Sequence, residues 1–161
     1  MRLRMIFELG GGAGYSAKNF LRAVDDDGEV YTCDINPVPK LAQNHHCILK
    51  DARDVQASDV NNKVIELIVF DCHLYQMQVF LRFRDLGLID SHTVLALHDT
   101  NTHPYKSVHW AYPVSQGYVH QAPERKMVND FVDMGYHAFC LHTRNSKHSP
   151  KLPYPRRHSH D

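Results

Sequence analysis

The chain has 161 residues, which is enough for one domain with a sizeable apolar core. Its 18 Lys and Arg residues balance 18 Asp and Glu residues, so no net positive charge is available to hold a nucleic-acid backbone. No apolar run reaches the roughly 18 residues that a membrane helix needs, and the first residues lack the apolar segment of a signal peptide. We therefore expect a protein that binds neither nucleic acid nor a membrane.

The four cysteines are scattered along the chain and form no C-x-x-C pair. They are Cys33, Cys47, Cys72 and Cys140. Three of them lie in or beside apolar runs, where a reduced thiol packs as a small apolar group. Scattered cysteines of this kind are typical of proteins in a reducing compartment, so we expect a cytoplasmic protein.

Apolar runs alternate with helical patterns along the chain, which is typical of repeated β-α units and a mainly parallel sheet. The expected fold class is therefore α/β, with a Rossmann-like, doubly wound sheet between two layers of helices. The sheet and helices are expected to form a single domain over residues 1–143. Strands are predicted over 3–9, 29–34, 46–50, 64–71, 92–98 and 136–143.

Three helices are predicted from the spacing of apolar residues. The first covers residues 17–24, where apolar side chains recur at helical spacing, and the acidic run over 25–28 is expected to end it. The second helix is predicted from residue 74 to near residue 87, and the third over 123–135. Both of these end at a glycine.

Two segments depart from this alternation. Residues 99–123 hold several Pro and Gly residues among three Tyr and one Trp, so we expect a lid or substrate wall over the carboxyl ends of the strands. The alternative is a loop that packs on its own aromatic side chains. Residues 144–161 are polar and rich in Pro, Arg and His, and they are predicted to form a flexible tail.

A glycine-rich loop follows the first strand and leads directly into the first helix. Glu8 lies near the end of that strand, and Gly10, Gly12 and Gly14 follow at alternate positions. Glycines allow the backbone to turn sharply and to approach a ligand closely, while the next helix presents unpaired N–H groups. The loop therefore predicts a small-molecule site, and a cofactor is the expected ligand.

This loop resembles motif I of the class I S-adenosylmethionine-dependent methyltransferases, whose pattern is E-x-G-x-G-x-G. The continuation Gly14-Tyr15-Ser16 resembles the small-molecule O-methyltransferases of the catechol and caffeoyl-CoA type. The resemblance implies that Tyr15 and Ser16, together with Glu8 and the alternating glycines, form the site for S-adenosylmethionine.

Two other interpretations of the loop stay open. Gly12, Gly14 and Ala17 also satisfy the looser G-x-G-x-x-G/A pattern of NAD(P)-dependent oxidoreductases, although Glu8 and Gly10 then have no role. A module that binds a nucleoside without catalysing a reaction would carry the same loop.

Acidic residues after the second and third strands are candidates for binding a nucleoside. Asp34 ends the second strand about 20 residues after the loop, where a carboxylate can accept the ribose hydroxyls of either cofactor class. Ile35 is placed to pack on the adenine ring. In methyltransferases an acid or amide after the third strand commonly contacts the adenine amino group, which implies this role for Asp51, with Ala52 beside it. The alternative for Asp51 is a cap on the next turn.

Further acids follow the fourth and fifth strands. Asp71 follows an apolar run, and His98 and Asp99 follow the next one, so neighbouring strand ends converge on one crevice. The segment resembles metal-dependent O-methyltransferases, including the catechol type and those acting on sugar hydroxyls in antibiotic biosynthesis, and a broader family with cephalosporin hydroxylase-like proteins. The resemblance implies that Asp71 and Asp99 hold Mg²⁺ or Mn²⁺, and His98, which stands where the antibiotic type has an acid, is the candidate for a third ligand. In the alternative without a metal, the acids bond to cofactor and substrate.

Methyl transfer to a hydroxyl requires an acceptor oxygen that has lost its proton or is losing it. His73 lies two residues beyond Asp71 and titrates near neutrality, so it is the candidate base, and Asp71 is the second candidate catalytic residue. His98 is a further candidate base. The alternative for His73 is a histidine at a helix N-terminus that bonds to the backbone.

Together these patterns predict an enzyme that methylates a hydroxyl of a small molecule, with S-adenosylmethionine and with or without Mg²⁺ or Mn²⁺. Compared with the family that it resembles, the chain lacks the N-terminal helices and a clear final antiparallel strand, so the domain is expected to be truncated at both ends. A homodimer in which the partner supplies the missing parts would explain this, and so would a minimal relative.

Overall fold

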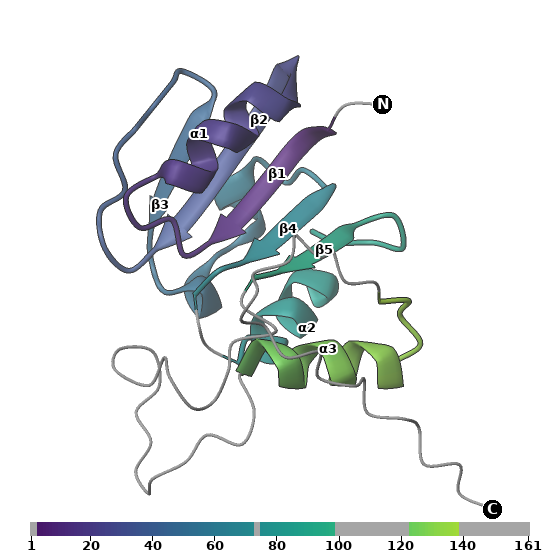
Figure 1. Ribbon diagram of the computed structural model, residues 1–161. Helices are drawn as coiled ribbons and strands as arrows, with labels where there is room; N and C mark the ends of the chain where they lie inside the picture. Colours follow the sequence, from purple (N-terminus) through teal and green to yellow (C-terminus); the bar gives the residue numbers. More distant parts are fainter. Residues whose placement is uncertain (1–2, 73–74, 99–122, 139–161) are drawn as a thin grey trace, which may run out of the picture.

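The computed structural model describes residues 3–72, 75–98 and 123–138 (Figure 1). Four predictions fall outside these residues: the lid up to residue 122, the tail over 144–161, His73 and Asp99. The expected single domain and the expected homodimer stay predictions.

The described strands form one five-stranded sheet in the order β3-β2-β1-β4-β5, and all neighbouring pairs are parallel. The strands are β1 (Leu3–Leu9), β2 (Val24–Asp34), β3 (His45–Leu49), β4 (Leu67–Phe70) and β5 (Val94–Leu97). This order confirms the predicted α/β, Rossmann-like fold. Because all strands run in the same direction, their carboxyl ends meet at one edge of the sheet.

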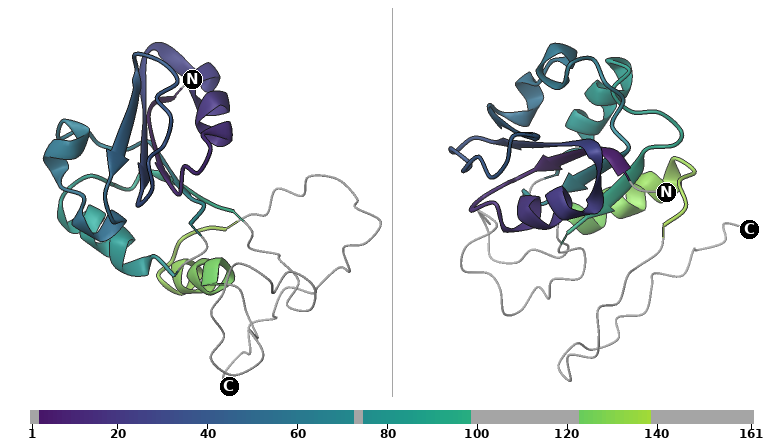
Figure 2. Two further views of the ribbon diagram at one scale, coloured as in Figure 1. Left: turned by 90° about the vertical axis from the view of Figure 1, so that its left-hand side faces the viewer. Right: turned by 90° about the horizontal axis from the view of Figure 1, so that it is seen from above.

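Helices cover both faces of the sheet. The described helices are α1 (Tyr15–Ala23), α2 (Met77–Asp85) and α3 (Pro123–Asp133), and the described 3-10 turns are η1 (Ala52–Asp54) and η2 (Ala57–Val60). Helix α1 lies on one face, whereas α2 and both 3-10 turns lie on the other (Figure 2). Helix α3 packs against α2, where the rings of Phe131 and Phe80 meet edge to face with 4.8 Å between their centroids.

Strand β1 lies in the middle of the sheet and is buried on both faces from Met5 to Leu9, which explains the apolar run over residues 5–7. Phe7 belongs to the larger core, under α2, where its ring meets Phe83 edge to face at 5.2 Å. Ile6 belongs to the smaller core, under α1. Side chains alternate between the faces of a strand, so Glu8 lies on the α1 side and is fully buried beneath the glycine loop.

The first helix ends near the predicted position, but the second strand begins earlier than predicted. Helix α1 ends at Ala23 and β2 begins at Val24, so the acidic run over 25–28 lies inside β2 and not in a turn. Val24 pairs with Leu3 and Glu29 pairs with Met5, so a single residue of β1 faces the whole acidic run. This run is a bulge in the strand, which keeps Asp side chains in the strand without burying them in the core.

The ends of the two later helices agree with the prediction. The backbone reverses at Gly87 after α2 and at Gly135 after α3, with φ of +69° and +93°. The last predicted strand is not present in the part of it that the structure describes, residues 136–138. Among the described residues, no helix is both long enough and apolar enough to cross a membrane.

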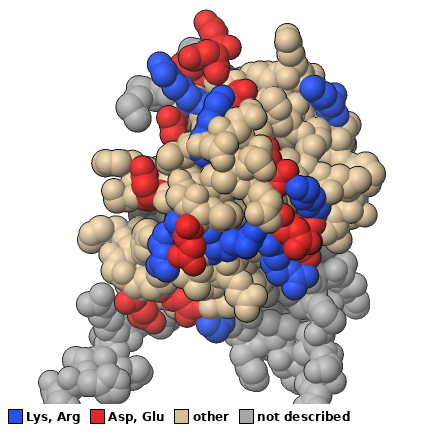
Figure 3. Space-filling view, turned by 180° about the vertical axis from the view of Figure 1, so that it is seen from behind, with Lys and Arg blue, Asp and Glu red and all other residues tan. Residues whose placement is uncertain are grey.

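Charged side chains of both signs share the face opposite to the view of Figure 1 (Figure 3). Lys and Arg side chains cross the middle of this face, and Asp and Glu side chains lie among them. Described ion pairs include Lys50 with Asp59 and Lys126 with Asp130, each with 2.7 Å between nitrogen and oxygen. The two signs are therefore mixed on this face rather than segregated.

Candidate functional site

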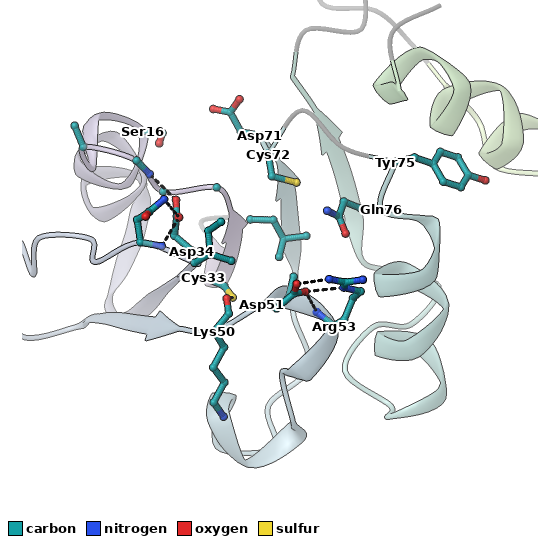
Figure 4. Close-up of a pocket in the computed structure, with 18 of the residues that line it drawn as sticks. Ser16, Cys33, Asp34, Lys50, Asp51, Arg53, Asp71, Cys72, Tyr75 and Gln76 are labelled. Carbon is teal, nitrogen blue, oxygen red and sulfur yellow. Dashed lines mark hydrogen bonds and ion pairs between the residues drawn. The ribbon is translucent and has the colours of Figure 1, made fainter. Parts of the chain in front are cut away.

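An open pocket of about 810 Å³ lies at the carboxyl edge of the sheet, where the ends of β1 to β4 meet α1 and α2 (Figure 4). This volume is typical of small-molecule sites, which measure roughly 300–1,000 Å³. Most of the predicted site residues that the structure describes line it. The glycine loop and α1 supply Gly10, Gly12, Tyr15 and Ser16, the end of β2 supplies Asp34 and Ile35, and the ends of β3 and β4 supply Asp51, Ala52 and Asp71.

The backbone of the glycine loop has φ values of +91° at Gly10, +47° at Gly12 and +79° at Gly14. At Gly10 a Cβ would lie 2.7 Å from the carbonyl carbon of Asp71 and closer still to its oxygen, so only glycine admits the end of β4. At Gly12 a Cβ would meet no atom within 4 Å. Gly14 caps α1 without a side-chain bond, which leaves N–H groups of the first turn to a ligand or water.

Two backbone donors hold Asp34 in place. The N–H of Gly12 donates to Oδ2 at 3.0 Å, and the N–H of Asn36 donates to Oδ1 at 2.8 Å. The Asn36 side-chain amide also donates to Oδ1, at the long distance of 3.5 Å. An ionised carboxylate accepts about four hydrogen bonds, so Asp34 keeps room for at least one ribose hydroxyl. The bond to Gly12 ties the acid to the glycine loop.

Two large side chains beside the pocket are mostly exposed. Tyr15 is 81% exposed and Ile35 is 72% exposed, although both line the pocket. Exposed apolar side chains at a pocket favour a ligand with an apolar face, because binding would remove them from water. The predicted contact between Ile35 and adenine is consistent with this exposure.

Asp51 caps η1, which is the alternative that the sequence left open. The Arg53 guanidinium lies 2.6 Å from its Oδ2, and the Arg53 N–H donates to its Oδ1 at 2.9 Å. The bond from the guanidinium, followed by that from the N–H, lowers the pKa of Asp51 to about 2. In Figure 4 this pair lies toward α2, whereas Asp34 lies toward α1. A contact from Asp51 to adenine stays a prediction.

Asp71 and His98 follow neighbouring strands, and their side chains meet as expected for a shared crevice. The His98 Nδ1 lies 2.8 Å from Asp71 Oδ1. The Asp71 N–H donates to the Leu9 carbonyl and the His98 N–H donates to the Phe70 carbonyl, so the backbone fixes both positions. Within the described residues no three His, Cys, Asp or Glu side chains are placed to hold a metal ion. Asp99 is outside that part, and the divalent metal stays a prediction.

Tyr75 is a pocket residue that the sequence analysis missed. Its hydroxyl donates to Asp130 of α3 at 2.5 Å, and Lys126 Nζ lies 4.3 Å from the centre of its ring. The bond to Asp130 raises the pKa of Tyr75, so the hydroxyl stays protonated and is a poor base. Helix α3 thereby anchors one wall of the pocket. Tyr75 and Asp130 are 55 positions apart, so no local sequence pattern reveals this contact.

Three fully buried polar residues, Glu8, Thr32 and His45, form a hydrogen-bonded row behind the glycine loop. Glu8 accepts one bond from Ser16 Oγ and another, of 3.0 Å, from Thr32 Oγ1. Thr32 Oγ1 lies 3.0 Å from His45 Nε2, and the Leu41 N–H donates to His45 Nδ1 at 3.2 Å. The sequence analysis named only Glu8. Pairing β1 with β2 identifies Thr32 as well, because Glu8 and Thr32 are register partners.

Burial is the largest influence on Glu8 and raises its pKa, and the bonds from Ser16 and Thr32 only partly oppose this. A carboxyl group with a raised pKa stabilises the fold fully below its ordinary pKa, and this contribution is lost as the pH rises through the folded-state pKa. Glu8→Gln removes the titration. The wild-type protein should therefore lose free energy of unfolding relative to Glu8→Gln as the pH rises from 4.5, measured by urea unfolding.

Asp59→Asn is a control with the opposite sign, because the bond from Lys50 lowers the pKa of Asp59. The wild-type protein should lose its advantage over Asp59→Asn as the pH falls below 3.8. A difference between wild type and Glu8→Gln that stays constant with pH would contradict a raised pKa at Glu8.

Comparisons with known proteins identify no family for this chain. No protein-family model matches it, and no curated protein matches it significantly. The Rossmann-like parallel sheet with a pocket at its carboxyl edge is consistent with binding of a nucleotide or another cofactor.

Proposed function

We propose that the protein is an S-adenosylmethionine-dependent methyltransferase that acts on a hydroxyl group of a small molecule. The observation that carries this proposal is the bond from Gly12 to Asp34, which joins the glycine loop after β1 to the acid after β2 at one pocket. An adenosyl group would place its ribose at Asp34 and its purine beside Ile35.

The glycine spacing favours S-adenosylmethionine over a dinucleotide. In the pattern E-x-G-x-G-x-G each glycine has its own role. Gly10 leaves room for the end of β4, Gly12 lines the pocket and Gly14 caps α1. Glu8 accepts a bond from Ser16, so it ties the end of β1 to the first turn of α1, on either side of the glycine loop. In the dinucleotide pattern Glu8 and Gly10 have no role, which supports the methyltransferase interpretation.

Methyl transfer forms a bond between the acceptor oxygen and the methyl carbon of S-adenosylmethionine and breaks the carbon–sulfur bond, whose electron pair goes to sulfur. The acceptor proton goes to a base. Our candidate base is His73, which follows the pocket residue Cys72 in the sequence. His98 is the second candidate in a reaction without a metal, because its Nδ1 lies 2.8 Å from Asp71 Oδ1, which orients the imidazole ring. In a metal-assisted reaction Asp71, Asp99 and His98 would instead hold Mg²⁺ or Mn²⁺.

Isothermal titration calorimetry with S-adenosylmethionine, S-adenosylhomocysteine, NAD⁺ and NADP⁺ tests the ligand class. We expect both S-adenosyl ligands to bind in the micromolar range that is common for enzyme substrates, and neither dinucleotide to bind measurably. Preferential binding of NAD⁺ or NADP⁺ would overturn the proposal in favour of an oxidoreductase.

Transfer of a labelled methyl group to a panel of hydroxylated small molecules tests the reaction itself. We expect labelled product from at least one acceptor, and the same assay with EDTA separates a metal-assisted reaction from one that uses a base alone. Binding of S-adenosylmethionine without transfer to any acceptor would instead support a non-catalytic nucleoside-binding module.

A further inference from the structure

We propose that His45 is a positioning residue for the pocket: its neutral Nε2–H form clamps the segment over residues 35–44, through Thr32 and Glu8, to Ser16 directly after the glycine loop. The segment and the loop both contribute lining residues to the pocket. Only the effect on cofactor affinity rests on the proposed function. The clamp itself depends on the buried row alone.

The donors fix the direction of every bond in this row. The Leu41 N–H donates to His45 Nδ1 at 3.2 Å, so Nδ1 carries no proton and Nε2 does. The Nε2–H group then donates to Thr32 Oγ1 at 3.0 Å. The Thr32 hydroxyl has one proton, and it goes to Glu8 Oε2 at 3.0 Å. A neutral His45 is required, and burial favours this form because it lowers the pKa of the imidazole.

Packing joins the same two parts of the chain. A Cβ at Gly11 would lie 3.0 Å from Val38 Cγ2, and a Cβ at Gly14 would lie 3.4 Å from Leu41 Cδ1. The segment therefore lies directly on the glycine loop. Its first residues line the pocket, and Leu41 near its other end is bonded to His45. The row thus supports the pocket from behind, where a bound ligand would not reach.

Amide hydrogen exchange in the ligand-free protein tests the clamp without any cofactor. Thr32→Val removes the hydroxyl and keeps the side-chain shape, whereas Thr32→Ser keeps the hydroxyl. We expect Thr32→Val to speed exchange at Leu41 and over residues 10–14 by about tenfold, and Thr32→Ser to retain the wild-type rates. The matched control is Thr93→Val, which removes a hydroxyl bonded to the Ile65 carbonyl and should leave these rates unchanged.

The protonation state of His45 gives a second readout that needs no variant. Long-range ¹H–¹⁵N NMR spectra of the wild-type protein should show a proton on Nε2 and none on Nδ1 at neutral pH. A proton on Nδ1 would overturn the clamp. Equal exchange rates in Thr32→Val and Thr32→Ser would also overturn it, and the NMR measurement decides the question should Thr32→Val fail to fold.

Cofactor affinity distinguishes this inference from the proposed function. Thr32→Val should raise the dissociation constant for S-adenosylhomocysteine about tenfold, and Thr32→Ser by less than about threefold. Unchanged affinity in a folded Thr32→Val variant would overturn the positioning role. A wild-type protein that binds no S-adenosylhomocysteine but shows the expected exchange rates would refute the methyltransferase proposal and still support the clamp.

Discussion

Replacing Gly10 with alanine is expected to lower the free energy of unfolding by roughly 2–5 kcal/mol. The added Cβ would lie 2.7 Å from the Asp71 carbonyl carbon, so either the loop or the end of β4 must move. The φ of +91° adds strain for any residue with a Cβ. Urea unfolding measures the loss.

Gly12→Ala is the matched control, since it adds the same methyl group two residues later. A Cβ at Gly12 would meet no atom within 4 Å, so the expected loss of unfolding free energy is only the roughly 1–2 kcal/mol of a left-handed backbone. Gly12 lines the pocket, so its methyl group should instead weaken binding of S-adenosylhomocysteine. Equal destabilisation by the two variants would contradict the close approach at Gly10.

Asp34→Ala is expected to weaken binding of S-adenosylhomocysteine by roughly tenfold to 150-fold, the range for loss of hydrogen bonds to a charged group. The variant removes the proposed acceptor of the ribose hydroxyls and also the partner of the Gly12 N–H at 3.0 Å. Calorimetry measures the affinity, and unfolding in urea checks that the substitution at this half-buried position leaves the fold intact.

Asp51→Ala is the comparison within the same pocket. Its carboxylate already pairs with Arg53 at 2.6 Å, and an exposed pair of this kind contributes about 0–1 kcal/mol to stability. If Asp51 serves only as a cap, the affinity should change by less than about threefold. A loss as large as that of Asp34→Ala would support the predicted contact with adenine. An unchanged affinity in Asp34→Ala would contradict the assignment of the ribose site.

The sequence was sufficient for the fold because parallel strands covered on both faces carry continuous apolar runs, as in β4. It failed at the start of β2, where an Asp-rich run ending in glycine has the composition of a turn but forms a bulge between the pairs that Val24 and Glu29 make with β1. Local composition does not specify that pairing, because the partner strand lies elsewhere in the chain.

Some residues of the candidate site could likewise be predicted from the sequence, and others could not. Asp34 and the alternating glycines follow strands directly, so their positions at the carboxyl edge could be predicted from chain order. Thr32 and His45 lie within strand runs, and their role depends on which strands are neighbours in the sheet. The placement of Tyr75 depends on Asp130 of α3, which lies 55 residues further along the chain.

The central position of β1 also has a consequence for synthesis on the ribosome. The first residues of the chain form β1, yet one of its two edges pairs with β4, from Ile6 opposite Leu67 to Leu9 opposite Phe70. Until Phe70 has emerged from the ribosome, β1 presents an unpaired edge, which is a template for pairing with other chains. The strand that carries the glycine loop therefore gains its second neighbour only after about 60 further residues have been synthesised.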